Sequence, residues 1–208
     1  MKLITNPIKL ISLIEKNIFN LSIFILTLLV FTITNPYRLH YWSADQEYII
    51  LNNILNLNFQ SIKYDHTGFA LFIFLKICFK ITSIFYQGID SNYSSFMNAL
   101  DENKLLNHIF LIRLFNFFII FFIIFFFNKI IYFLIKNRLV SLILSISILL
   151  SKPILGLLFE VRTDSMSLLL YLIAIYIFIL SSYRYLVAFF LTITYFNKVN
   201  FIPYIFIF

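Results

Sequence analysis

The chain has 208 residues, of which 62% are hydrophobic and 12% charged, and its mean hydropathy is +0.94. Soluble domains are about 45–50% apolar and about 25% charged, so this composition excludes a soluble globular protein and predicts a membrane protein. The formal net charge of +7 then reflects lysine and arginine in cytoplasmic loops, and we expect no nucleic-acid partner.

The first predicted membrane span is the apolar segment 17–34, which is about long enough to cross at ~20 residues per span. Lysines precede it, which predicts a cytoplasmic amino terminus. Pro36 ends the span, so a first outer loop is expected over residues 35–107. Within that loop, segment 43–58 is predicted to be a surface helix because apolar and asparagine residues alternate at helical spacing.

Segment 67–86 is apolar, but we expect it to lie along the outer membrane surface. One reason is a polar stripe at helical spacing, formed by Lys76, Lys80, Ser83 and Gln87. The other is charge. If the segment crossed the membrane, the basic residues within 129–138 would face outward, against the tendency of lysine and arginine to stay inside.

Four further spans are predicted, at residues 108–128, 139–158, 165–182 and 185–208. The expected fold is therefore an all-α, polytopic membrane bundle, a single transmembrane domain over residues 1–208 with interfacial helices in its first outer loop. We expect it in the cytoplasmic (inner or plasma) membrane. The chain stops inside an apolar run, and we interpret it as the amino-terminal part of a longer module.

Asp45 and Glu47 open the predicted surface helix. Acidic residues in a first turn stabilise a helix by about 0.3–1 kcal/mol through its dipole, which is one explanation for them. A carboxylate held on a helix at the membrane edge is also well placed as a general base. The residues alone leave both explanations open.

Further along, Tyr64, Asp65 and His66 precede Gly68 in a segment that fits a turn, a hydrogen-bonding site or a metal site. Arg113 lies within a predicted span. A charged residue there is costly and indicates function, although extension of its side chain to the outer interface explains it equally well.

A second charged group lies in the short outer turn before span 165–182, where Arg162 stands between Glu160 and Asp164. This pattern fits a solvated loop with an internal ion pair or a charged site. Lys198 has no carboxylate near it in the sequence, so it either reaches the membrane surface or meets an anion. Motifs for zinc proteases, paired cysteines, phosphate loops and serine hydrolases are absent from the sequence.

Taken in order, these segments resemble the GT-C superfamily of polyprenyl-phosphate-sugar glycosyltransferases, of the protein-mannosyltransferase and aminoarabinose-transferase type. The resemblance covers nearly the whole chain and rests on the order of short motifs: Asp45-Gln46-Glu47, Tyr64-Asp65-His66-Thr67-Gly68, Arg113-Leu114, Arg162-Thr163-Asp164 and Asn197-Lys198. The chain departs from the family pattern where Gln46 separates the acidic pair, Thr67-Gly68 replaces Pro-Pro, and Asn197 replaces Thr.

The resemblance implies an inverting membrane glycosyltransferase of GT-C type with its active site on the outer face. The donor would be a polyprenyl-phosphate-linked sugar, and the acceptor a glycan, lipid or protein. No cofactor is required, and a divalent metal is optional. Asp45 would be the general base and Glu47 its support, with the reverse assignment open. The expected donor-phosphate ligands are Lys198 and Arg162, then His66 and Arg113, with Tyr64, Asp65 and Asp164 as further site candidates.

Two other functions fit the same residues. A transporter fragment would line a pathway near the middle of the membrane with ionisable residues, whereas here they concentrate in outer loops and span ends. A non-catalytic membrane scaffold would use the outer loop to bind a partner. The discriminating question is whether the side chains of Asp45, His66, Arg162 and Lys198 converge on one outer-facing cavity.

Overall fold

The computed structural model describes residues 7–34, 36, 44–56, 68–98, 101–180 and 183–197. For residues 7–16, 44–46, 159 and 196 it describes the backbone only. The regular secondary structure of this part of the chain is entirely helical, as the sequence predicts. Its helices are α1 (Pro7–Ile33), α2 (Ala44–Leu55), α3 (Phe69–Phe85), α4 (Tyr93–Asn98), α5 (Glu102–Ile135), α6 (Arg138–Leu149), α7 (Lys152–Phe159), α8 (Thr163–Leu180) and α9 (Arg184–Asn197).

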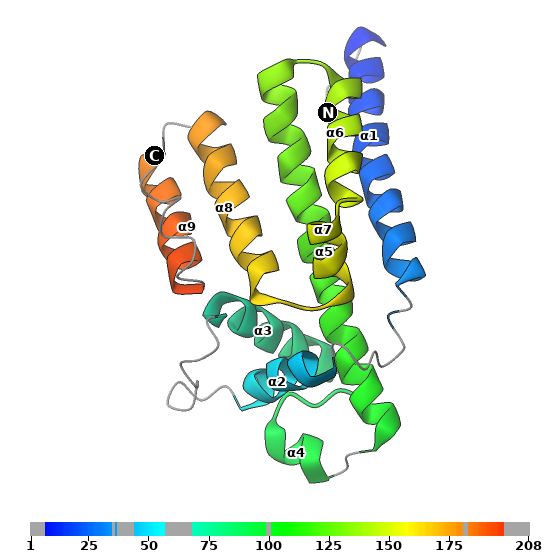
Figure 1. Ribbon diagram of the computed structural model, residues 1–208, viewed down its shortest axis with the longest axis vertical. Helices are drawn as coiled ribbons and strands as arrows, with labels where there is room; N and C mark the ends of the chain where they lie inside the picture. The colour runs from blue at the N-terminus through cyan, green and yellow to red at the C-terminus, as the bar shows by residue number, and fades with distance from the viewer. Residues whose placement is uncertain are drawn as a thin grey trace, which may run out of the picture.

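The helices form a bundle with a cap at one end (Figure 1). Helices α1, α5, α6, α8 and α9 run roughly along the long axis, whereas α2 and α3 lie across its lower end and α4 lies below them. Helix α5 is the centre of the bundle, since it packs against α1, α6, α7 and α8, and its first turns extend down to α2.

Among the described residues, two helices, α5 and α8, are long and apolar enough to cross a membrane, and α6 with α7 makes a third span if the two are counted together. The structure therefore supports a membrane-type bundle with two or three candidate spans, by length and composition. The segment expected to span at 139–158 consists of two helices, α6 and α7, bent by 63° at their junction, so if it crosses the membrane it does so as a broken span. Pro153 stands in the first turn of α7, and proline cannot donate the hydrogen bond that a continuous helix needs there.

Helix α3, at the lower end of the bundle, has one buried face and one exposed face. Leu71, Phe72, Leu75 and Phe79 are buried, while Ile77, Ile81, Ile84 and Phe85 remain exposed. Its transverse orientation and exposed apolar face are those expected of a helix lying on a membrane surface. That location itself stays a prediction.

The polar stripe of α3 is only partly on the outside. Lys76 turns inward, and its ammonium donates hydrogen bonds to the carbonyl oxygens of Leu55 (3.0 Å) and Ser91 (2.5 Å). A cation at the carboxyl end of α2 suits the helix dipole. Burial, and then the neighbouring charge of Lys80, lowers the pKa of Lys76. Lys76 therefore fastens α2 to α3 instead of facing the interface.

At the opposite end, a short turn joins α5 to α6. Lys136 ends α5 in the left-handed region, with a φ of 57°, and its N–H bonds to the carbonyl of Tyr132. Asn137 then caps α6, because its side chain accepts hydrogen bonds from the N–H groups of Leu139 and Val140. This turn brings the basic residues of 129–138 to the upper end of the bundle.

Candidate functional site

A buried ion pair fixes α2 against α5. Arg113 Nε lies 2.8 Å from Glu47 Oε1 and Arg113 Nη2 lies 2.7 Å from Glu47 Oε2, a two-pronged geometry that suits a guanidinium and a carboxylate. Arg113 Nη1 also donates to the carbonyl of Pro36 at 2.8 Å. Glu47 is 0% exposed and Arg113 is 3% exposed. Since a lone buried charge is costly, each residue requires the other.

One turn further along α5, Asn116 joins α5 to α7 and α8. Its amide donates to the carbonyl of Leu157 at 2.6 Å, and its side-chain oxygen lies 2.9 Å from the hydroxyl of Ser165. That hydroxyl also lies 2.8 Å from the carbonyl of Arg162, so its single proton is donated to one of the two oxygens at a time. Both Asn116 and Ser165 are buried. The beginning of α8 is thereby held against the same face of α5 as the ion pair.

Asn197, at the end of α9, ties three helices together. Its amide donates to the carbonyl of Thr163 (2.9 Å) and to the hydroxyl of Ser167 (2.6 Å). Its side-chain oxygen accepts from the N–H groups of Ala70 (3.0 Å) and Leu71 (3.3 Å), which have no partner within the first turn of α3. Asn197 is 0% exposed, and all its hydrogen-bonding capacity is used inside the protein.

Gly68 makes this junction close enough to form. A Cβ atom added at Gly68 would lie 2.2 Å from Cγ2 of Thr163, so a larger residue would force α3 away from α8. Chain positions within two residues of several predicted site residues therefore meet. Gly68 follows the segment of His66, Thr163 follows Arg162, and Asn197 precedes Lys198.

The structure describes only some of the predicted site residues. Tyr64, Asp65, His66 and Lys198 lie outside the described residues, and Asp45 is described only as part of the backbone of α2. The convergence of the four discriminating side chains on one cavity therefore stays a prediction. Arg162 is exposed and forms an ion pair with Glu160, which fits the solvated-loop interpretation, and Asp164 lies in the first turn of α8. Arg113 and Glu47 are brought together.

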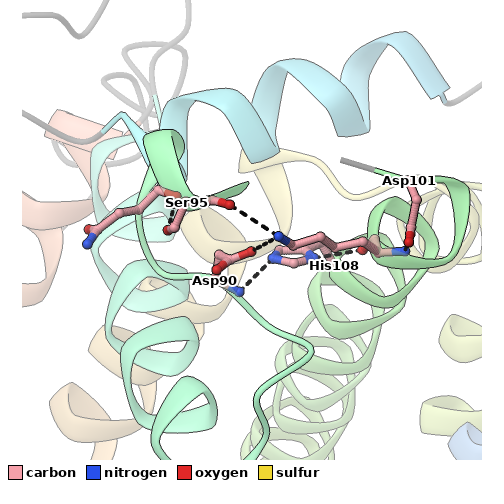
Figure 2. Close-up of polar contacts among 6 residues, drawn as sticks. Asp90, Ser95, Asp101 and His108 are labelled. Carbon is pink, nitrogen blue, oxygen red and sulfur yellow. Dashed lines mark hydrogen bonds and ion pairs between the residues drawn. The ribbon is translucent and has the colours of Figure 1, made fainter. Parts of the chain in front are cut away.

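A second polar cluster, which the sequence did not single out, surrounds His108 near the start of α5 (Figure 2). Its Nε2 accepts the N–H of Asp90 at 2.9 Å, while its Nδ1 donates to the carbonyl of Lys104 at 2.7 Å, which fits a neutral ring protonated on Nδ1. The ammonium of Lys104 lies 2.5 Å from Asp90 and 3.1 Å from the carbonyl of Ser95. The one signal in the sequence was a histidine at the edge of a long apolar run.

The Glu47–Arg113 pair and the His108 cluster are well bonded internally, so they position helices around the end of the bundle that carries α2–α4. Within the described part of the chain, no group of three or more His, Cys, Asp and Glu side chains is arranged to hold a metal ion. No protein-family model matches this chain, and no curated protein or solved structure is significantly similar to it. Function is therefore inferred from the residues and their geometry.

Proposed function

We propose that this chain functions in a membrane glycosyltransferase of the GT-C type, which moves a sugar from a polyprenyl-phosphate donor to an acceptor on the outer face of the membrane. The observation that supports this most strongly is the Asn197 junction. It joins the starts of α3 and α8 to the end of α9, so that residues within two positions of three predicted donor-phosphate ligands meet at one place.

The buried ion pair sharpens the assignment of the two carboxylates. Glu47 is fully engaged with Arg113, so a proton taken up by Glu47 would break a buried ion pair. The proposal therefore gives the general-base role to Asp45, two residues earlier in α2, and gives Glu47 the role of holding that helix in place. By the same reasoning Arg113 is a positioning residue, and the donor phosphate falls to Lys198, Arg162 and His66.

In the proposed reaction, Asp45 accepts the proton of an acceptor hydroxyl or amine. The acceptor oxygen or nitrogen forms a bond to the anomeric carbon of the sugar, with inversion, while the bond from that carbon to the phosphate oxygen breaks. Polyprenyl phosphate leaves with the bonding electron pair. Lys198 and Arg162 stabilise the charge that develops on it, which is the usual electrostatic contribution to such transfers. A lipid-linked donor fits this location because its phosphate stays at the membrane surface.

The test is a transfer assay with the protein reconstituted in liposomes and a panel of labelled polyprenyl-phosphate sugars, measured with EDTA and with added Mg²⁺. A general base contributes about 10²–10⁴-fold, so Asp45→Asn should lose most turnover while still binding donor. Lys198→Ala should weaken donor binding roughly tenfold, as the loss of a charge-assisted contact does.

Glu102→Gln is the matched control, because Glu102 is an exposed carboxylate in the first turn of another helix at the same end of the bundle. It should leave turnover and donor binding unchanged. Absence of transfer from every donor would contradict the enzyme and favour the transporter or scaffold alternatives. Full activity of Asp45→Asn with a dead Glu47→Gln would reverse the two carboxylate roles.

A further inference from the structure

A cavity of about 590 Å³ opens among α1, α5, α6 and α8, at the end of the bundle opposite to α2 and α3. Its described lining residues are Phe19, Asn20, Asn128, Lys129, Tyr132, Phe133, Lys136, Arg138, Ser141, Tyr176 and Leu180. None of the residues that the proposed reaction uses belongs to it. The cavity needs a separate explanation.

The charge of this cavity is positive. Lys129, Lys136 and Arg138 line it, and none of its described lining residues is acidic. A concave site with several cations and no acidic lining favours an anionic occupant.

The cations that line the cavity differ in burial. Lys129 is partly buried, donates to the side-chain oxygen of Asn20 at 3.2 Å, and lies 5.0 Å from the ring of Phe125. Arg138 lies 5.9 Å from the ring of Tyr132, and Lys136 is exposed at the rim. The positive charge therefore extends from the rim into the cavity.

Apart from the polar residues Asn20, Asn128 and Ser141, the other lining groups are apolar or aromatic, and several of these are exposed. Tyr132, Phe133 and Leu180 present large apolar surfaces beside the cations. A small inorganic anion would leave these surfaces in water, whereas a lipid covers them with its acyl chains and brings its headgroup to the cations. Basic pockets between membrane helices are suited to anionic headgroups in this way.

We infer that this cavity binds the headgroup phosphate of an anionic membrane phospholipid. Lys136 and Arg138 contact the phosphate from the rim, and Lys129 contacts it from the wall. Tyr132, Phe133 and Leu180 line the acyl chains. The site is separate from the proposed donor site, because it lies at the other end of α5 and draws on none of the same residues.

The experiment measures binding to the purified protein in neutral detergent by titrating its thermal unfolding midpoint, since a ligand that binds the folded state raises it. Three probes are compared at constant ionic strength: short-chain phosphatidylglycerol, phosphatidylcholine with the same acyl chains, and inorganic phosphate. Phosphatidylglycerol should bind at least roughly tenfold more tightly than phosphatidylcholine, and phosphate alone should give no comparable shift.

The test variant is Lys136→Gln, chosen because Lys136 is exposed and its loss should not impair folding. It should weaken phosphatidylglycerol binding several-fold, and the Lys129→Gln/Lys136→Gln/Arg138→Gln variant should remove the preference over phosphatidylcholine. Lys80→Gln is the matched control, since it removes an exposed lysine from α3 at the other end. Equal binding of the two lipids, an equal loss in Lys80→Gln, or a shift that phosphate reproduces would each overturn the inference.

Discussion

The two ends of the bundle use charge in opposite ways. At the end covered by α2–α4, charges of opposite sign pair with each other, in the buried pair Glu47–Arg113, the partly buried pair Asp90–Lys104 and the exposed pair Glu160–Arg162. At the other end, the described lining of the cavity carries cations without acidic residues. In the first arrangement, paired opposite charges fix the positions of helices. In the second, three cations line a cavity, and we infer that they face an anionic partner outside the chain.

The prediction with the largest expected effect is that the two ends of the bundle face opposite sides of the membrane. Single cysteines placed at Asn92 and Lys136, both exposed positions, should react with a membrane-impermeant maleimide from opposite sides in a Cys78→Ser background. Asn92 should be labelled from outside and Lys136 from inside, because lysine and arginine favour the cytoplasmic face. Labelling of both from one side would refute the predicted topology.

A large effect is also expected from the buried ion pair. Arg113→Met leaves Glu47 as an unpaired buried charge, which should lower the free energy of unfolding by about 3–5 kcal/mol. Glu47→Met/Arg113→Met should recover much of that loss, because it removes both charges together. Unfolding of the purified protein by SDS or heat measures both. A double variant no more stable than Arg113→Met would mean that the two residues are not coupled.

The smallest effect should come from the exposed pair of the turn between α7 and α8. The side chains of Arg162 and Glu160 are 47% and 25% exposed, and such pairs contribute at most about 1 kcal/mol. Arg162→Gln should therefore barely change the unfolding free energy in the same assay, and less still at high salt. A loss as large as that of Arg113→Met would contradict the contrast. If Arg162→Gln loses little unfolding free energy, a defect of this variant in donor binding can be attributed to the missing side chain and not to unfolding.

Local patterns predicted most of the described helices, but not the short helix α4 and not which helices pack together. Long apolar runs predicted α5 and α8, and the alternation of apolar and asparagine residues predicted α2. The bend between α6 and α7 was missed although Pro153 was visible, because the surrounding run was apolar enough to be taken as one span. Arg113 was recognised as costly, yet its partner Glu47 is 66 positions away and is set by how α2 crosses α5.

The same limit explains the site residues that were misjudged or missed. Asn197 was interpreted as a substitution within a motif, whereas its four hydrogen bonds depend on three helix ends meeting. His108 went unnoticed because one of its partners is the backbone N–H of Asp90, which no residue pattern reveals. Contacts of this kind are fixed by tertiary packing, and a single sequence does not encode them at any regular spacing.

The left-handed backbone of Lys136 has a consequence for attempts to stabilise this protein. Glycine adopts that conformation without steric cost, whereas a residue with a Cβ loses about 1 kcal/mol or more. Lys136→Gly is thus an obvious choice for a more heat-resistant protein, and it also deletes a cation from the rim of the basic cavity. Screening for thermostability in lipid-free detergent would favour this substitution. It would select a more stable protein that binds anionic phospholipid less tightly.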